Sequence, residues 1–569
     1  MISRNEKNLG VHLFVGALAI VAAATNSLHV LVGWWHNPPS HVFTGIAHSV
    51  ADYFLYTDVM AQGAAGHLVA VAHFTNEILP PLSFYWFNTM VGWLGGLVGL
   101  SPFATYNVAV VVLVFLLCLL WYKLCRLLFP ANRLAQCTAF LFILTASSFI
   151  DPKGFIQNGR LDLLFPFWFS PAPAFNRLGA VPHQIFQTIL LILLVIEFCR
   201  KQKNFLALSL LTFLAALANP IQLILVLAAA VVTAIWQRRM LPLVMLFAVA
   251  IPSLILSKEW LAHPIIAVAN AWEALQYQRI PPDQLIVAIG PIAILALFGI
   301  IPFIRAATSL RVMYLSYGVL SFVAFYSPLS SMTGTAIARF LHPAPYGILG
   351  LLGAEGILAI SHWLATLITQ SQITKHQTPS IKQVLNSKVL NLKRFGFGIW
   401  NLGFVWNLEF GIWNLLMILY LLFTLPALYS QINARANPAL HTFFSETLRS
   451  NLNHVPKPVV DALSWIKQQP DGGRPVVLTD PALPYDILVP VFTGKISFTG
   501  HPIHTLYPQV KENLRSDFFT SRMSPDRAKQ FLTDHRIRFI VTKPTSVYLP
   551  YLFLKKSFEN DAIAIFVYD

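Results

Sequence analysis

The stretch that decides the fold is Ala104–Leu128, which reads ATYNVAVVVLVFLLCLLWYKLCRLL. It holds no charged residue before Lys123, so it is long and apolar enough to cross a membrane as a helix. Similar apolar runs recur along most of the chain, which is 56% hydrophobic and 11% charged, with a mean hydropathy of +0.62. A soluble globular protein carries roughly 25% charged residues. The composition therefore predicts a polytopic α-helical membrane protein, because lipid leaves the backbone few other ways to pair its polar groups.

Apolar segments of this kind predict about eleven spanning helices. Their approximate positions are residues 11–34, 104–128, 134–151, 184–200, 204–219, 221–237, 240–257, 285–304, 312–328, 345–369 and 410–430. The apolar segment Leu82–Leu100 is instead predicted to lie in the membrane interface, because counting it as a span would place Lys123 and Arg126 outside. Every strongly basic link then falls on one side, at 123–133, 200–203, 238–239, 305–311 and 375–394. The positive-inside rule predicts a multi-pass protein of the plasma or inner membrane, with a cytoplasmic N-terminus and an extracytoplasmic C-terminus.

The chain divides into two predicted parts. Residues 1–430 form a transmembrane domain, whose first outer loop, 35–103, carries interfacial helices and whose cytoplasmic insert lies at 371–409. From residue 431 to 569 charges and turn residues return, and strands alternate with helices, which predicts a small extracytoplasmic α/β domain. Its predicted elements are helices Val459–Gln469 and Pro525–His535 and strands Arg474–Asp480, Ile537–Thr542 and Ala562–Tyr568.

Charge, cysteine content and sequence motifs indicate which partners and cofactors the chain can have. The net charge is +15, but the basic residues fall mostly in short links between apolar runs. That distribution fits topology signals and contact with anionic lipid headgroups, so membrane lipids rather than nucleic acid are the predicted partners. The four cysteines lie in or beside apolar segments without metal-ligand spacing, so no disulfide framework is predicted. No phosphate-binding loop or dinucleotide fingerprint follows a strand, so no nucleotide cofactor is predicted, and the oligomeric state stays open.

The first outer loop holds the strongest candidate site. Its only charged residues are Asp52, Asp58 and Glu77. Asp52 could act as a general base, or it could hold a divalent cation together with nearby histidines. The histidines close to it in sequence are His48, His67 and His73. The alternative is a loop acid that caps an interfacial helix, since Asp is a favoured N-cap residue.

Two runs in this loop resemble a known enzyme superfamily. They are Asp52-Tyr53…Tyr56…Gln62-Gly63…Gly66-His67 and Asn76-Glu77-Ile78-Leu79-Pro80-Pro81-Leu82-Ser83-Phe84-Tyr85-Trp86. Both resemble the first outer loop of the GT-C superfamily. These are membrane glycosyltransferases that use polyprenyl-phosphate sugars, including the protein mannosyltransferase and aminoarabinose transferase branches. The resemblance implies that Asp52 is the catalytic or metal-binding acid, that Glu77 lines the same cavity, and that Asp151, or else Asp162, is a second family acid.

Cationic side chains near the outer face are candidates for binding a phosphate. The string Ala338-Arg339-Phe340-Leu341-His342-Pro343 resembles the family's entry to a late helix, which implies that Arg339 holds the phosphate. The acidic residue usual near this string is missing, and Thr333-Gly334-Thr335 stands there. Arg177 and Lys258 are either interfacial anchors or further parts of a phosphate clamp. The remaining candidate substrate-binding residues, close to Asp52, are Tyr53 and His48, and the candidate metal ligands are Asp52 and His73.

A turn in the C-terminal part also resembles the family. Thr499-Gly500-His501-Pro502-Ile503-His504-Thr505 is similar to a Gly-His-x-x-x-Thr turn in members with the same architecture. Two histidines in a turn do not by themselves make a metal site, because a protein-bound metal needs three or four ligands.

The predicted function is transfer of a sugar from a polyprenyl-phosphate-linked donor to an acceptor at the outer membrane face. Asp52 is the general base or a metal ligand, and a divalent metal ion is the candidate cofactor. A sugar on a lipid phosphate carries a good leaving group, so the enzyme mainly needs a base for the acceptor and positive charge for the phosphate. Two alternatives stay open, a transporter or flippase of a lipid-linked or small polar substrate and a non-catalytic membrane assembly protein. The acids lie in outer loops rather than at mid-membrane, which favours the enzyme.

Overall fold

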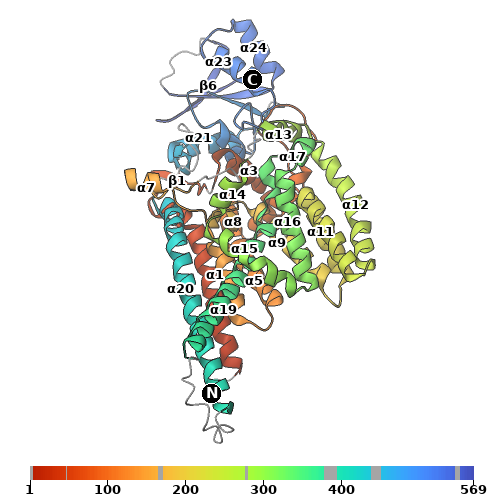
Figure 1. The fold of residues 1–569 in the computed structure, drawn as a ribbon. Helices are drawn as coiled ribbons and strands as arrows, with labels where there is room; N and C mark the ends of the chain where they lie inside the picture. Colours follow the sequence, from red (N-terminus) through yellow and green to blue (C-terminus); the bar gives the residue numbers. More distant parts are fainter. Residues whose placement is uncertain are drawn as a thin grey trace, which may run out of the picture.

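The computed structural model describes residues 4–46, 48–164, 171–275, 280–376, 394–437, 450–473, 475–544 and 551–569. A helical region makes up most of the molecule, and the C-terminal region, which contains the larger sheet, covers one end of it (Figure 1). Helix α1 (Arg4–Asn26) begins at the opposite end. Of the predicted insert 371–409, residues 377–393 lie outside the described part of the chain.

Seven described helices are long and apolar enough to cross a membrane, and two bent pairs raise the number to nine if each pair is one span. The seven are Pro102–Leu128 (α5), Pro182–Cys199 (α9), Pro220–Gln237 (α11), Leu241–Leu261 (α12), Ser309–Tyr326 (α16), Pro343–Gln370 and Leu408–Ala436. The last two lie in α18 (Pro343–Tyr346) with α19 (Ile348–His376), and in α20 (Arg394–Ala436). The bent pairs are Gly10–Asn26 with Leu28–Trp35 (α1 and α2), at 53°, and Pro282–Ile289 with Pro291–Arg305 (α14 and α15), at 100°.

The predicted count of about eleven spans is therefore not confirmed. Two predicted segments, 134–151 and 204–219, contain helices of only 13 and 14 residues, α6 (Arg133–Thr145) and α10 (Phe205–Ala218). A helix rises about 1.5 Å per residue, so these helices are shorter than the roughly 30 Å of a bilayer core. Helix α10 stops before Pro220 because proline, which lacks an N–H, starts a new helix there.

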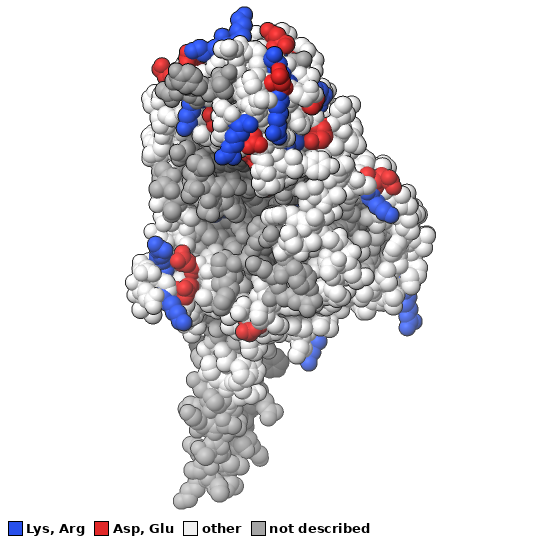
Figure 2. All heavy atoms as spheres, turned by 90° about the horizontal axis from the view of Figure 1, so that it is seen from above, with Lys and Arg blue, Asp and Glu red and all other residues white. Residues whose placement is uncertain are grey.

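The helical region exposes apolar side chains over much of its surface. Leu206, Leu297 and Leu422, for example, are 80%, 64% and 61% exposed. Figure 2 shows the Lys, Arg, Asp and Glu side chains gathered mostly toward one end of the face in view, with few over the rest. Extended apolar surface of this kind marks contact with lipid or with another protein, and here it agrees with a polytopic membrane fold.

The first outer loop is built on two helices in close contact. These are α3 (Val50–Ala64) and α4 (Trp86–Leu97), which lies inside the predicted interfacial segment. A Cβ on Gly63 would lie 2.1 Å from the carbonyl oxygen of Thr89, and one on Gly92 would lie 2.1 Å from that of Met60. Only glycine lets two backbones come this close, so α4 fixes the position of α3 and of the residues it carries.

The C-terminal region contains a five-stranded sheet of order β4-β3-β5-β7-β6. The strands are β3 (Val476–Thr479), β4 (Ile496–Ser497), β5 (Ile537–Thr542), β6 (Lys555–Glu559) and β7 (Ala564–Val567). The helices are α21 (Lys457–Gln468), α22 (Val489–Thr493), α23 (Pro508–Phe519) and α24 (Pro525–Asp534). Strand β3 runs parallel to β4 and β5, whereas β7 is antiparallel to β5 and β6. All the elements predicted for this region are present.

The C-terminal region is joined to the first outer loop by hydrogen bonds between distant parts of the chain. Strand β1 (His41–Phe43) pairs antiparallel with β2 (His454–Pro456). The hydroxyl of Thr505 donates to the carbonyl of Phe74 at 2.9 Å, and the N–H of Leu506 donates to the hydroxyl of Thr75 at 3.1 Å. These bonds place the turn 499–505 directly against the loop that carries α3.

Candidate active site

Asp52 lies in the first turn of α3, three residues after the N-cap residue Ser49. It is therefore not the capping residue that one interpretation of the sequence made it. Its side chain is 39% exposed, so water or a substrate can reach it. The first turn favours an anion because the unpaired backbone N–H groups of a helix point toward it. The same helix face carries Tyr56, one turn further on.

His501 faces Asp52 from the C-terminal region. It belongs to the turn between β4 and α23, and its side chain is 1% exposed. Its Nδ1 accepts hydrogen bonds from the backbone N–H groups of Ile503, at 3.1 Å, and His504, at 3.0 Å. Its Nε2 lies 3.4 Å from Oδ1 of Asp52. The turn thus aims one ring nitrogen at the carboxylate.

The surroundings of Asp52 keep its carboxylate ionised. Burial alone would raise its pKa, but the hydrogen-bonding contact with His501 outweighs burial, and the pKa of Asp52 falls to about 2. Burial lowers the pKa of His48 and of His504, so both rings are neutral at physiological pH. A single negative charge is thus held among neutral imidazoles.

Tyrosine side chains add further donors around the carboxylate. The ring of Tyr56 lies 5.8 Å from that of Tyr85 and 4.8 Å from that of His183, edge-on in both cases. The hydroxyl of Tyr85 lies 3.0 Å from Nε2 of His504. Burial, together with the charge of Asp52, raises the pKa of Tyr56 and of Tyr85, so both phenols keep their protons.

Arg339 supplies the positive charge of this site. It lies in the short helix η2 (Ile337–Phe340), and its side chain is 41% exposed. Its guanidinium contacts both carboxylate oxygens of Glu273, with Nε donating to Oε2 at 3.3 Å. Burial would lower the pKa of Arg339, but Glu273 and, to a smaller extent, Tyr56 and Asp52 raise it. The charge of Asp52 therefore acts on Arg339.

An acid from a distant part of the sequence, Glu273, binds Arg339. The residues next to the 338–343 string contain no acid. Glu273 lies on α13 (Pro264–Leu275), with a side chain that is 12% exposed. Its Oε2 also accepts a hydrogen bond from the backbone N–H of Ala336, at 3.1 Å. Glu273 thus orients both the Arg339 side chain and the backbone that leads into it.

Glu77 and Asp151 make other contacts. Glu77 accepts hydrogen bonds from Nζ of Lys511, at 2.7 Å, and from the hydroxyl of Thr75, so it joins the first outer loop to α23. Asp151 is the N-cap of α7 (Pro152–Asn158), with Oδ1 accepting from the N–H of Lys153 at 3.0 Å. Helix α7 projects from the side of the helical region (Figure 1). A role for either acid beside Asp52 stays a prediction.

His48 and Tyr53 lie on either side of the start of α3. His48 faces the Asp52 site, and its Nε2 lies 2.9 Å from the hydroxyl of Tyr106. Tyr53 is fully buried, and its hydroxyl donates to the carbonyl of Thr44 at 2.6 Å. The geometry of Tyr53 is that of an anchor for α3, and a substrate contact by His48 stays a prediction.

Arg177 and Lys258, the other two candidate phosphate ligands, differ in exposure. Arg177 is 3% exposed and donates to four backbone carbonyls, those of Ile143, Ala146, Pro171 and Ala172. This arrangement uses most of its N–H groups to hold the chain together. Lys258 is exposed in the last turn of α12. Asp52 is among the groups that raise the pKa of Arg339.

The structure does not bring the two candidate metal ligands together. His73 pairs with Asp58, with Nδ1 at 3.0 Å from Oδ1, and Gln62 donates to the same carboxylate at 2.9 Å. Within the described ranges, no three His, Cys, Asp or Glu side chains converge as metal ligands. His501 replaces His73 beside Asp52, but its Nδ1 accepts two N–H groups, so the neutral ring carries its proton on Nε2. A nitrogen that holds a proton has no lone pair for a metal, so Asp52 and His501 do not fit a shared ion.

Comparisons with known proteins give matches at the level of structure. No protein-family model and no curated protein matches the sequence. The apo oligosaccharyltransferase of Archaeoglobus fulgidus is similar at 12% identity and a TM-score of 0.47, over 94% of this chain and 69% of that chain. ArnT from Cupriavidus metallidurans bound to undecaprenyl phosphate is similar at 14% identity and a TM-score of 0.47, over 98% of both chains. At such low identity the chemistry has to come from the chain's own residues.

Sequence reasoning missed the part that Glu273 and Tyr85 play and did not connect His501 with Asp52. Glu273 gave one signal, since it is the only charged residue in the apolar helix Pro264–Leu275. Tyr85 gives no signal in the sequence beyond its place in the Pro-Pro-Leu run. The 499–505 turn was noticed for its motif, but nothing in its local sequence says which loop it touches.

Proposed function

We propose that this chain is a GT-C-type membrane glycosyltransferase that transfers a sugar from a polyprenyl-phosphate donor to an acceptor at the outer membrane face. The observation that carries this proposal is one solvent-reachable site with an ionised Asp52 and the cation Arg339, whose side chains are 39% and 41% exposed. A base for the acceptor and a cation for the phosphate are the two groups that this reaction needs.

The residues at the site suit a single displacement. The acceptor's nucleophilic atom attacks the anomeric carbon, and the bond from that carbon to the phosphate oxygen breaks. The proton of the acceptor passes to Asp52, and the phosphate leaves with the bonding electrons toward Arg339. A carboxylate with a pKa of about 2 is a weak base, so the proton transfers late, once the new bond has made the acceptor acidic. Tyr56 and Tyr85, both protonated, supply hydroxyl donors that can orient the sugar.

Arg339 suits a phosphate because its planar guanidinium can donate two parallel hydrogen bonds to a carboxylate or a phosphate. Glu273 already binds this guanidinium through both carboxylate oxygens. A phosphate at Arg339 would therefore share the guanidinium with Glu273 or replace it.

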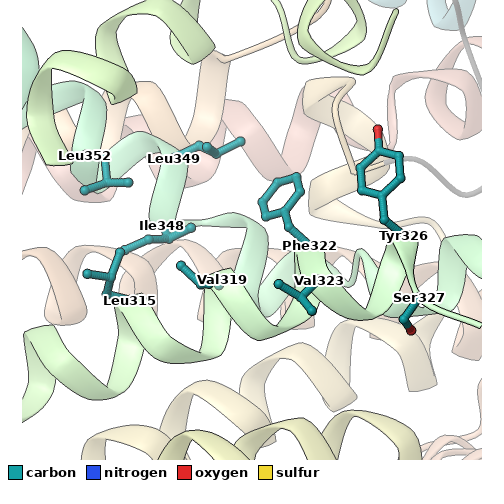
Figure 3. Close-up of a pocket in the computed structure, with 10 residues that line it drawn as sticks. Leu315, Val319, Phe322, Val323, Tyr326, Ser327, Ile348, Leu349 and Leu352 are labelled. Carbon is teal, nitrogen blue, oxygen red and sulfur yellow. The ribbon is translucent and has the colours of Figure 1, made fainter. Parts of the chain in front are cut away.

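An apolar groove is suited to the polyprenyl chain. It has a volume of about 620 Å³ and runs between α16 and α19 (Figure 3). Its lining includes Leu315, Val319, Phe322 and Val323 of α16 and Ile348, Leu349 and Leu352 of α19. Helix α16 also binds the segment that carries the cation, because the hydroxyl of Ser321 donates to the carbonyl of Phe340, next to Arg339. A lipid chain in this groove could extend its phosphate toward Arg339.

The proposed orientation places the site outside the cytoplasm of a plasma- or inner-membrane protein. The C-terminal region and the first outer loop form one end of the molecule, and α1 starts at the other (Figure 1). The basic links between spans support an N-terminus in the cytoplasm.

Replacing the base tests the proposal. Asp52→Asn keeps the size of the side chain but removes its ability to accept a proton, and one positioned base contributes roughly 10²–10⁴ in rate. Asp526→Asn is the matched control, because Asp526 is an exposed acid in the first turn of α24. Purified full-length variants would be assayed for sugar transfer from polyprenyl-phosphate sugars. Loss of transfer in Asp52→Asn alone supports the proposal, and equal transfer by both variants refutes the role of Asp52.

A further inference from the structure

The imidazole of His501 is fixed in one protonation state by its own turn. The N–H groups of Ile503 and His504 both point at Nδ1, at 3.1 and 3.0 Å. A protonated Nδ1 would put a hydrogen between these donors, so the ring is neutral with its proton on Nε2. The turn itself is held against the first outer loop, since the hydroxyl of Thr505 accepts from the N–H of His501 and donates to Phe74. Rotation of the ring would break the two hydrogen bonds to Nδ1.

The N–H on Nε2 is directed at Asp52. This atom is fully buried and makes no hydrogen bond to other residues in the described part of the chain, and Oδ1 of Asp52 lies 3.4 Å away. A buried donor without a partner is costly, and an ionised carboxylate at this distance is the acceptor that can satisfy it after a small shift. The C-terminal region thus brings a donor to the place beside Asp52 where a metal ion would otherwise bind.

We propose that His501 is a positioning residue, whose Nε2–H holds the Asp52 carboxylate in place of a metal ion. This inference rests on the proposed transfer reaction. It assigns the C-terminal region a part in the chemistry, because the region completes the surroundings of the base. His501 does not touch the reacting atoms and acts through Asp52.

Two substitutions separate this role from a structural one. His501→Gln keeps an N–H donor near the position of Nε2 and loses the acceptor for the turn. His501→Asn keeps an acceptor near the position of Nδ1, so the hydrogen bonds that hold the turn remain. It loses the donor to Asp52. A positioning role predicts that kcat falls about tenfold to a hundredfold in His501→Asn with KM little changed, since a hydrogen bond to a charged group has about this effect. It predicts that His501→Gln retains more of kcat than His501→Asn.

A merely structural role predicts the opposite order, with His501→Asn active and His501→Gln impaired, and this order would overturn the proposal. Binding of Mn²⁺ to the full-length protein, followed by its electron paramagnetic resonance signal, gives a readout that is independent of transfer. We expect Mn²⁺ binding to be the same in the wild type and in Asp52→Asn, because Asp52 is not a metal ligand in this proposal. One tightly bound Mn²⁺ per chain in the wild type, lost in both Asp52→Asn and His501→Asn, would also overturn the proposal. Failure of Asp52→Asn to slow transfer is a different result, which refutes the proposed function and leaves the Mn²⁺ measurement valid.

Discussion

The ion pair between Lys511 and Glu77 is expected to hold the C-terminal region in its working position. Lys511 is 3% exposed and Glu77 27% exposed, and Nζ donates to Glu77 at 2.7 Å and to the hydroxyl of Thr75 at 2.9 Å. Lys511→Met keeps most of the side-chain stem and removes both bonds. Hydrogen bonds to charged groups contribute about 1.5–3 kcal/mol, and partial exposure of Glu77 favours the lower end, so we expect a loss of about 2 kcal/mol. Thr75 also accepts the N–H of Leu506, which follows the turn that carries His501 and His504. Loss of the ion pair should therefore loosen this turn beside Asp52 and slow transfer about tenfold.

A double-mutant cycle tests this reasoning and also the predicted role of Glu77. Lys511→Met, Glu77→Gln and the double variant would be compared by unfolding in mixed detergent micelles and by sugar transfer. A coupling energy of about 1–2 kcal/mol is expected, since each single change already breaks the pair. The double variant should then transfer sugar about as fast as Lys511→Met. A coupling near zero would contradict the pairing. A further hundredfold loss in the double variant would show that Glu77 acts on the substrate, as its resemblance to the family acid implies.

Three further outcomes are expected. Glu273→Gln should tighten binding of polyprenyl phosphate about two- to fivefold, because a half-exposed ion pair competing for Arg339 is worth only about 0.5–1 kcal/mol; unchanged or weaker affinity in an equilibrium binding assay would contradict this. Val319→Trp, which fills the groove of Figure 3, should raise the KM of a long-chain donor but not that of a two-isoprene donor, and an equal rise for both would remove the groove from lipid binding. Burial would lower the pKa of His73, but the contact with Asp58 outweighs burial, so the pKa is raised. The pair therefore stabilises the fold fully at a pH below the pKa of an unfolded histidine. This contribution is lost as the pH rises through the raised pKa of the folded state. Thermal stability of Asp58→Asn should lack that dependence, and identical pH profiles for variant and wild type would argue against it.

Much of the fold could be predicted because lipid and local patterning dictate it. Apolar length alone predicts the long helices. The alternation of short strands with helices predicts the α/β region, whose strand Ile537–Thr542 forms β5 over the same residues. The sharp bend between α14 and α15 was missed, because an apolar run does not show where its helix breaks. The break lies at Gly290, where φ is +84°, just before Pro291. Backbone conformation of this kind is favoured by glycine but is not required by its presence in a sequence.

Two residues of the candidate site could be predicted from the sequence. Asp52 is one of only three charged residues in the first outer loop, and Arg339 lies in the string 338–343 that resembles a family motif. Their partners could not be predicted, since Glu273 and His501 reach the site by tertiary packing. Closeness in sequence favours His73 over His501 as a neighbour of Asp52, but in the structure His73 pairs with Asp58.

The central claim is that Asp52 takes the acceptor's proton during transfer. The most direct measurement is a single-turnover rate for Asp52→Asn with donor and acceptor both saturating, so that changes in binding do not contribute. Asp526→Asn and wild-type protein would be measured in parallel. The account predicts a rate roughly 10²–10⁴ lower for Asp52→Asn and no change for Asp526→Asn. A rate for Asp52→Asn within about threefold of wild type, equivalent to less than about 0.7 kcal/mol in the barrier, would contradict it.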